Sequence, residues 1–409
     1  MFDYLHGKGY RNLSRRANSS SGGCLALSRR RAHSGTGPPP GHPCDRPAAR
    51  SRRTLAFVTT VTKTLPVDAA SSLADELLRP QAERVDQGVV PRSHLAAIAR
   101  AGLLGVTAPT ALGGGGESAS VGREVAEVLA GACGATWFVW TQHALPLGTL
   151  VRAEHPRGRE LANGGLLAGV AVAHLRRPGP PAVTATRTGG GWRFDGHVGW
   201  MTSWGLCDVF LLCALTDNAQ VVAALVDARE QPGLTSGLPM RLAAMQATQT
   251  VALDLDCLHV PDDAIVEVVQ ASGWHEADRQ KTANASPHTF GLHREIVRRL
   301  AATAGRKGDA TAAGLARQLD DEGEELRARA YRLIDEVPAG EQVEARLRAR
   351  AQSLELVVRS ATSLIAATGG AAMSLDAAPQ RLAREAVFHL VQAQTAAVRD
   401  ATLHLLAGR

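Results

Sequence analysis

Two groups of residues in this 409-residue chain have types and spacings that could do chemistry by themselves. The four consecutive glycines Gly113–Gly116 follow a predicted helix and suggest a phosphate-binding loop, but no strand–glycine–lysine–serine order surrounds them. A flexible turn is the simpler interpretation. The six cysteines form no CxxC pair, which disfavours structural zinc and a disulfide framework and suits a reducing compartment. We therefore expect no metal site.

The charge of the chain is unevenly distributed. Residues 1–60 contain eleven Lys and Arg against two Asp and Glu, whereas the remainder contains 34 against 37. The net charge of +6 thus belongs to the N-terminal segment, and nothing indicates the basic domain face that nucleic-acid binding needs. No apolar run approaches the roughly 20 residues of a membrane helix. We expect a cytoplasmic protein that binds neither nucleic acid nor a membrane.

The N-terminal residues 1–62 are predicted to be a disordered, basic, low-complexity tail. They are rich in Arg, Ser, Gly and Pro and show no helical or strand period. Such a segment buries too little apolar area to offset the entropy of ordering it. Three origins stay open: upstream sequence translated from an early start codon, a targeting peptide, or a basic interaction tail.

Apolar periodicity predicts helices at both ends of the remaining body. Residues 63–167 are expected to form an N-terminal helical domain. Residues 271–409 contain four amphipathic segments separated by short breaks, which is typical of an antiparallel four-helix bundle. The third segment shows the clearest apolar stripe, made of Leu354, Val357, Ala361 and Leu364.

The middle of the body, residues 168–270, shows the alternation of short β-strands. Asp195-Gly196 lies between two runs of alternating residues, "GWRF" and "HVGW", and predicts a hairpin turn. Several short strands over about 100 residues suggest a small antiparallel barrel. The predicted fold class is therefore α+β, with a helical domain, a β-barrel and a helix bundle in that order.

This arrangement, together with four sequence stretches in the same order, resembles the acyl-CoA dehydrogenase superfamily. The stretches are "PRSHLAAIARAGLLGVTAPTALGGGG", "EVAEVLAGACGATWFVWTQHALP" with His143, "GWRFDGHVGWMTSWGLCDVFLL" and "ATGGAAMSLDAAPQRLAREAVFHLVQAQT". No single stretch is specific, but the resemblance covers about residues 72–405. It implies an FAD-binding oxidoreductase that removes hydrogen from an acyl thioester.

The resemblance places three residues at the flavin ring. Trp200, Met201 and Thr202 would lie against the isoalloxazine, with Thr202 near the N5 edge. A strand can hold a rigid aromatic wall for a flat ring, and a hydroxyl two residues later faces the same side. A core tryptophan beside a polar edge threonine is the alternative without a cofactor.

Four further cofactor residues are implied near the end of the chain. Gly369 and Gly370 would let the backbone approach the pyrophosphate of a neighbouring subunit's FAD, since glycine permits close approach. Arg384 matches the arginine of an Arg-Asp pair, with Glu385 in place of the aspartate, and Thr395 could touch the dinucleotide. The alternatives are an inter-helix break and a solvated charge pair.

The catalytic base of the family is missing from its usual place. The reaction needs a carboxylate over the α-carbon of the thioester, yet the resemblance puts Ala393 there, and neither Gln392 nor Gln394 can remove a proton. Some members place the base before an arginine on the first bundle helix. The nearest match gives Asp278 and Glu276 as candidate catalytic residues, with surface acids as the alternative.

His389 lies one helical turn before Ala393 and shares its face. A satisfied or solvent-facing histidine is the simpler interpretation. Two other departures weaken the family pattern: "AVAHLRRPGPPAVTAT" replaces a polar loop that closes over flavin and substrate, and Ala366 replaces a glutamine before the glycine pair.

Three functions fit these features. The first is an acyl-CoA dehydrogenase, the second a reduced-flavin monooxygenase on the same fold, and the third a non-catalytic paralogue in a hetero-oligomer. The expected partners are an acyl-CoA or acyl-carrier thioester and an electron acceptor, either electron-transfer flavoprotein or oxygen. By the same resemblance we expect a homodimer or homotetramer.

Overall fold

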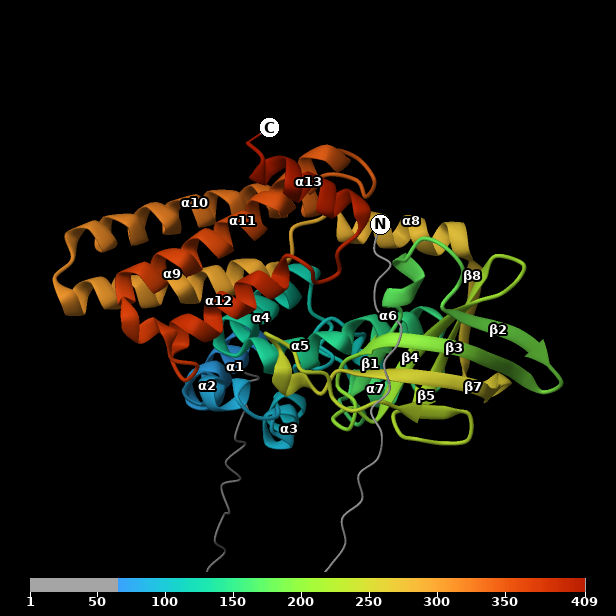
Figure 1. The fold of residues 1–409 in the computed structure, drawn as a ribbon. Helices are drawn as coiled ribbons and strands as arrows, with labels where there is room; N and C mark the ends of the chain where they lie inside the picture. Colours follow the sequence, from blue (N-terminus) through green and yellow to red (C-terminus); the bar gives the residue numbers. More distant parts are fainter. Residues whose placement is uncertain (1–64, 409) are drawn as a thin grey trace, which may run out of the picture. The chain divides into compact units, whose positions relative to one another are not determined.

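The computed structural model describes residues 65–408, so the predictions for residues 1–62 lie outside the described residues. The N-terminal part of the body is helical (Figure 1). A π-helical turn, Ala74–Leu78, joins α1 to α2 without a break, because the cap residues between them keep helical backbone angles. The helices are α1 Pro66–Leu73, α2 Arg79–Asp86, α3 Arg92–Arg100, α4 Ala119–Ala132, α5 Gly134–Gln142, α6 Ala144–Arg152 and α7 Gly158–Ala162.

Eight strands follow and form one sheet. They are β1 Ala168–Ala171, β2 Val183–Thr188, β3 Gly191–Met201, β4 Val209–Leu215, β5 Gln220–Asp227, β6 Leu234–Ser236, β7 Val251–Pro261 and β8 Ile265–Gln270. The order is β6-β7-β3-β2-β4-β5-β8, and β1 pairs with β4. Both β1 and β2 run parallel to β4, so the sheet is mixed, which corrects the expected purely antiparallel barrel. The segment after β1, including the 3-10 turn Ala173–Arg176, brings the chain back beside the same strand.

The predicted hairpin turn at Asp195-Gly196 is wrong. Strand β3 runs straight through both residues, and the turn between β2 and β3 is made by Gly189 and Gly190. Gly196 instead marks a register shift against β7, with φ of +131°. A Cβ at this position would lie 2.1 Å from the Ala182 carbonyl oxygen, so the glycine is needed for a bulge and a close approach.

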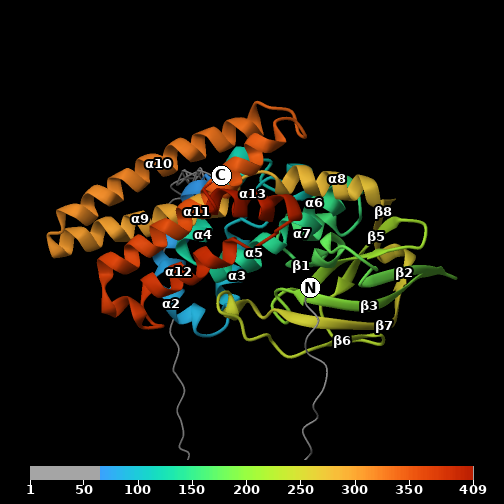
Figure 2. The same cartoon turned by 45° about the horizontal axis from the view of Figure 1, so that its top comes forward.

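The C-terminal part is again helical. Its helices are α8 Ala271–Thr282, α9 Pro287–Lys307, α10 Ala310–Asp335, α11 Val343–Thr368, α12 Ala378–His389 and α13 Ala396–Leu406. Helices α9, α10 and α11 run alongside one another in both views (Figures 1 and 2), and their apolar stripes share a core with α12. The expected order of helical domain, sheet and helix bundle is confirmed. The described residues 65–408 fall within one compact unit, so the boundaries at 63, 168 and 271 stay a prediction.

The fourth predicted bundle helix is two helices. Helix α12 ends at His389 and α13 begins at Ala396, and residues 390–395 form a loop between them. Ala393 has φ of +49°, which a helix cannot contain, and the Thr395 hydroxyl accepts a hydrogen bond from the Val398 N–H and caps α13. The continuous apolar pattern hid this break.

The N-terminal helices meet the bundle where α4 crosses α9. A Cβ on Gly291 would lie 2.0 Å from the Glu127 carbonyl oxygen, and one on Gly131 would lie 2.6 Å from the Gly291 carbonyl oxygen. The buried Glu127 carboxylate also accepts hydrogen bonds from Arg294, Arg327 and Tyr331 of α9 and α10. Small residues and one buried carboxylate thus fix the distance between the two parts.

No helix of the described residues is both long enough and apolar enough to cross a membrane.

The crossing predicts a strong position dependence for glycine replacement within α9. Gly291→Ala would push a methyl into a backbone carbonyl and should destabilise the protein by about 3 kcal/mol. Gly305→Ala on the same helix meets nothing within 4 Å and should stabilise it by up to about 1 kcal/mol, because alanine favours helices over glycine. Urea unfolding of the two variants measures both effects. Equal stability of the two variants would contradict the close crossing.

Candidate functional site

The end of strand β3 presents one exposed aromatic ring. The Trp200 side chain is 47 % exposed, whereas Met201 is fully buried and Thr202 is buried at 7 %. Strand β3 ends at Met201, and Ser203 has φ of +75°, so the alternation of the strand stops before Thr202. Strand periodicity predicts that Trp200 and Thr202 face the same side. In the structure Trp200 is exposed and Thr202 is buried, so this prediction is wrong.

The Thr202 hydroxyl belongs to a buried chain of hydroxyl groups. Its Oγ1 lies 3.1 Å from Thr250 Oγ1, which lies 3.2 Å from Thr248 Oγ1. Thr248 donates to the Met245 carbonyl oxygen at 2.8 Å. Since each hydroxyl donates once, Thr250 donates to Thr248 and Thr202 donates to Thr250. The lone pairs of Thr202 remain free, so in this arrangement it can accept a hydrogen bond from a ligand.

The glycine pair at the end of α11 is open. Gly369 has φ of +80° and ψ of −156°, a conformation that favours glycine, and a Cβ on either Gly369 or Gly370 would meet nothing within 4 Å. Both residues are exposed. A ligand or another chain could reach this backbone closely, as the predicted phosphate role requires.

Arg384 and Thr395 already have partners within the protein. Arg384 donates to both oxygens of Asp86 and, at 3.2 Å, to the Ala243 carbonyl oxygen. Glu385 is 3 % exposed and pairs with Arg381 at 2.7 Å, so Arg384 and Glu385 are not the solvated pair considered above. Thr395 caps α13. Arg384 and Glu385 are each held by an ion pair within the protein, and each keeps one buried atom, Arg384 Nε and Glu385 Oε2, without a partner among the described residues.

The two candidate acids on α8 differ in surroundings. Glu276 is exposed and accepts hydrogen bonds from Arg279 and Gln280, and the Arg279 hydrogen bond lowers the pKa of the Glu276 carboxyl. The Asp278 side chain is 12 % exposed and accepts two hydrogen bonds from Arg176, at 2.7 and 2.8 Å. Arg176 comes from "AVAHLRRPGPPAVTAT", so a salt bridge to α8 occupies the segment that replaced the family's polar loop.

A buried arginine joins α8 to the loop that carries Ala393. Arg350 of α11 donates to the carbonyl oxygens of Thr282, Gln392 at 3.0 Å and Ala393 at 3.3 Å. Burial is the largest effect on the pKa of Arg350 and lowers it, whereas the negative charge of Asp278 raises it. The structure thus brings the region of Asp278 and the Ala393 loop together through Arg350.

Three aromatic rings, at the end of α12 and on the helices packed against it, contact one another in the core. The Trp137 ring centroid lies 4.3 Å from that of His288 and 5.4 Å from that of His389, and the two imidazoles are 4.5 Å apart. His389 is 2 % exposed, and its Nδ1 has no partner in the part of the chain that the structure describes. Burial, followed by the charge of Arg350, lowers the pKa of His389 to about 3. His389 is therefore buried and neutral, and its hydrogen bonding is incomplete.

His143 is a satisfied core residue. Its Nδ1 accepts from the Ala168 N–H at 3.0 Å, and its Nε2 donates to the Leu161 carbonyl oxygen at 3.1 Å. Both bonds need the neutral ring, and burial lowers the pKa of His143 to about 4.

Sequence reasoning missed Arg350, His288 and Arg176. One signal for Arg350 was available: it lies four residues before Leu354, at the start of the apolar stripe of α11, where a charged residue is unusual. Nothing local marks Arg176, because its partner Asp278 is 102 residues away.

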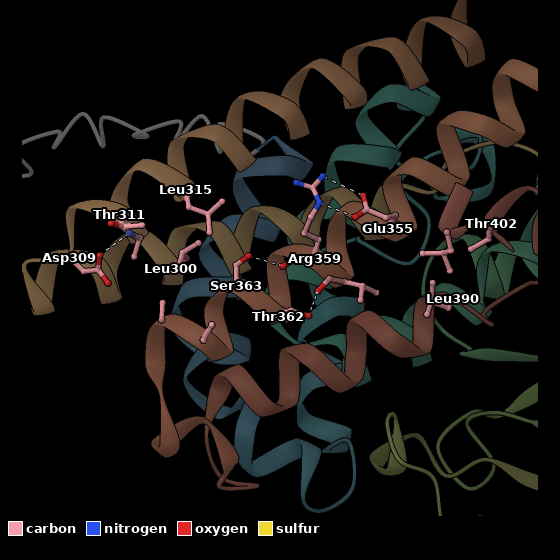
Figure 3. A pocket seen from close by; sticks show the side chains of 15 residues that line it. Leu300, Asp309, Thr311, Leu315, Glu355, Arg359, Thr362, Ser363, Leu390 and Thr402 are labelled. Carbon is pink, nitrogen blue, oxygen red and sulfur yellow. Dashed lines mark hydrogen bonds and ion pairs between the residues drawn. The ribbon is translucent and has the colours of Figure 1, made fainter. Parts of the chain in front are cut away.

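A pocket of about 650 Å³ opens among helices α9, α10, α11 and α13 (Figure 3). Leu300, Leu315 and Leu390 give it apolar walls. The Thr362 and Ser363 hydroxyls in its lining donate back to carbonyl oxygens of α11, at 2.9 Å each. None of the sequence-predicted site residues lines this pocket.

Comparisons with known proteins agree with this architecture. Residues 62–153 match the acyl-CoA dehydrogenase N-terminal domain. Benzylmalonyl-CoA dehydrogenase of Aromatoleum aromaticum is 26 % identical over 206 residues, which cover 48 % of this chain and 54 % of that protein. The chain matches little more than half the length of such relatives.

Two solved structures share the fold. Butyryl-CoA dehydrogenase from Megasphaera elsdenii has a TM-score of 0.71 at 16 % identity, covering 86 % of this chain and 99 % of that one. Dibenzothiophene monooxygenase from Paenibacillus sp. A11-2 has a TM-score of 0.70 at 18 % identity, covering 84 % and 97 %. The chain therefore has the acyl-CoA dehydrogenase fold, and its residues 62–153 match the N-terminal domain of that family.

The buried histidines predict a loss of stability in mild acid. The pKa is about 4 for His143 and about 3 for His389 in the folded protein, against about 6.5 in an unfolded chain. Below pH 6.5 the unfolded chain therefore binds protons that the folded protein does not, and stability falls as the pH falls. Each histidine should account for about 2 kcal/mol of the difference in unfolding free energy between pH 7 and pH 5.

Urea unfolding of His389→Gln at the two pH values measures this contribution. The variant should lose less stability between pH 7 and pH 5 than the unchanged protein does, by about 2 kcal/mol. His404→Gln, at an exposed residue of α13, is the matched control and should keep the full difference. An identical pH dependence in His389→Gln would show that His389 is not held neutral.

Proposed function

We propose that this protein is an FAD-dependent oxidoreductase of acyl-CoA dehydrogenase type that desaturates an acyl thioester. The exposed Trp200 ring at the end of β3 carries this proposal, because a rigid and accessible aromatic surface can stack on a planar flavin. The likeness to acyl-CoA dehydrogenases, which are flavoproteins, supports a flavin. FAD in particular rests on the resemblance of Trp200, Thr202 and the glycine pair to the family's contacts.

The residues fit one end of the cofactor better than the other. Trp200, Thr202 and the buried Ser203 hydroxyl, which has no partner among the described residues, fit the flavin ring. Met201 could contribute only its backbone, since its side chain is in the core. Arg384 and Thr395 are engaged elsewhere, so phosphate contacts within one chain reduce to the open Gly369–Gly370 backbone. This supports a homodimer or homotetramer in which a second copy completes the dinucleotide site.

The desaturation step requires a proton acceptor. When bound, the flavin would supply at N5 the acceptor for the hydride from the β-carbon, and a carboxylate of this chain would have to take the α-proton of the thioester. Ala393 cannot accept the proton. Asp278 is our candidate acceptor, because it lies one turn before Thr282, whose carbonyl oxygen binds Arg350. Because both oxygens of Asp278 bind Arg176, the aspartate would have to leave that salt bridge, in part, to act as a base.

The salt bridge between Arg176 and Asp278 also favours a second function, that of a reduced-flavin monooxygenase. A reduced-flavin monooxygenase needs no α-carbon base. Because Thr202 already donates to Thr250, it can only accept a hydrogen bond from a ligand, which suits the N5–H of a reduced flavin. The chain also shares its fold with a monooxygenase. A non-catalytic role in a hetero-oligomer is the third function, and it would follow if the protein bound no flavin.

The remaining assignments follow the first proposal. The substrate is an acyl-CoA or acyl-carrier thioester, and the electron acceptor is electron-transfer flavoprotein or oxygen. The site of action is the cytoplasm.

Trp200 should control flavin affinity. We expect Trp200→Ala to weaken FAD binding by about tenfold or more, because the ring loses its stacking surface. Trp192→Ala removes the same ring type from the other end of β3, beside Arg187, and should leave the affinity unchanged. Titration with FAD, followed by flavin fluorescence, measures both. Equal effects of the two variants would remove Trp200 from the site, and no binding by the unchanged protein would contradict both enzyme functions.

Substitutions at Asp278 and Ala393 test which residue, if any, is the catalytic base. If Asp278 is the base, Asp278→Asn should abolish anaerobic bleaching of bound flavin by an acyl-CoA, while Glu276→Gln on the same helix leaves it intact. If no base exists, the unchanged protein should not bleach, and Ala393→Glu should create the activity, because it restores a carboxylate at the family's position. Full bleaching by Asp278→Asn would exclude Asp278. Colour change only with reduced flavin and oxygen would support the monooxygenase.

A further inference from the structure

The Arg350 guanidinium lies where three parts of the protein meet. The residue is 4 % exposed, on the inner face of α11. One nitrogen donates to the Thr282 carbonyl oxygen, at the last residue of α8, and the other to the carbonyl oxygens of Gln392 and Ala393, at 3.0 and 3.3 Å. A single side chain therefore binds the end of one helix and the backbone of the α12–α13 loop.

This buried charge has no carboxylate directly opposite it. No Asp or Glu of residues 65–408 lies within ion-pair distance of Arg350, and its neighbour Asp278 is bound to Arg176. Burial lowers the pKa of Arg350 to about 10. Burying a cation without a counter-ion is unfavourable. Carbonyl dipoles, including the one at the negative end of α8, are what stabilise it here.

The loop that Arg350 binds has an unusual backbone. Ala393 adopts φ of +49°, a left-handed conformation that costs a non-glycine residue about 1 kcal/mol. Such conformations persist only where the surroundings enforce them, and they are concentrated at functional sites. The hydrogen bonds from Arg350 to the carbonyl oxygens of residues 392 and 393 provide that enforcement.

From these contacts we infer that Arg350 is a positioning residue, which fixes the α12–α13 loop at Ala393 relative to the end of α8. The inference rests on the proposed function, since that function makes this loop a wall of the substrate site. Asp278 lies one turn before Thr282 on α8, so the same guanidinium sets the separation between Asp278 and the Ala393 backbone. Both positions concern the base of the proposed reaction. Asp278 is the candidate base, and Ala393 occupies the position at which the family has its base.

The chain contains a matched control for this role. Arg346 lies one turn earlier on α11, is 3 % exposed, and also donates to uncharged oxygens. Its partners are Glu341, Val337, Pro338 and Asn284, none of which is in the α12–α13 loop. Arg346→Met and Arg350→Met therefore remove equivalent buried cations, and only the second should free the loop.

Hydrogen exchange tests the contact without any assumption about activity. In Arg350→Met, the amides of Gln392 and Gln394, which bond within the loop region, should exchange about tenfold faster or more. Arg350→Lys, which keeps the charge and one donor, should restore part of the protection and guards against a variant that fails to fold. Arg346→Met should leave these amides unchanged. Equal exchange in the two methionine variants would overturn the inference.

Kinetics separate positioning from general stabilisation. With flavin bound and an acyl-CoA or reduced-flavin assay that works for the unchanged protein, Arg350→Met should lower kcat about 100-fold with little change in KM, and Arg346→Met should retain kcat. A loosened loop with unchanged kcat would overturn the positioning role. If the unchanged protein binds no flavin, the proposed function fails, and the exchange comparison alone then decides whether Arg350 holds the loop.

Discussion

The crossing of α4 and α9 is the constraint on which the rest of the molecule depends. Two glycines bring the helix backbones together until each lies against a carbonyl of the other, and a Cβ on Gly291 would overlap the Glu127 carbonyl oxygen. At the same crossing, the Glu127 side chain binds α9 and α10. This contact fixes where α5 and the start of α9 stand, and so it places Trp137 and His288 against His389 at the end of α12.

Charge is buried in this protein in two different ways. Glu127, Glu295 and Asp86 are each almost inaccessible to solvent, and each binds at least one arginine from a helix distant in the sequence, so they join the N-terminal helices to the bundle. Arg350 is matched only by backbone carbonyls. Replacing an arginine in the first kind of contact leaves a buried carboxylate without its ion-pair partner. Replacing Arg350 instead removes the hydrogen bonds that hold the α12–α13 loop. The carboxylate–arginine pairs therefore stabilise the packing of the helices, whereas Arg350 fixes the position of one loop.

The sequence predicted those features of the fold that depend on the spacing of apolar residues. The order of helices, sheet and helices was confirmed, because apolar spacing reports which face of an element is buried. It misplaced a turn at Asp195-Gly196, where a glycine needed for close approach looks like a turn residue, and it missed the break at Ala393, which contains neither Gly nor Pro. For the site, it selected Arg384 and Asp278 by position. It could not know that Asp86, 298 residues away, and Arg176 hold them, because such pairs form only on folding.

The pairing of acids with arginines bears on the reaction itself. A carboxylate removes a proton best when its lone pairs are free, yet Asp278 is bound to Arg176 and Glu385 to Arg381. The Ala393 position, which the family reserves for the base, keeps its backbone in a strained and clamped conformation even though its side chain is a methyl group. Under the proposed function, a loop held so firmly without a reactive side chain would shape the space over the flavin. Such a loop can serve desaturation only with a base supplied by α8, and it can serve an oxygen-dependent reaction as it stands.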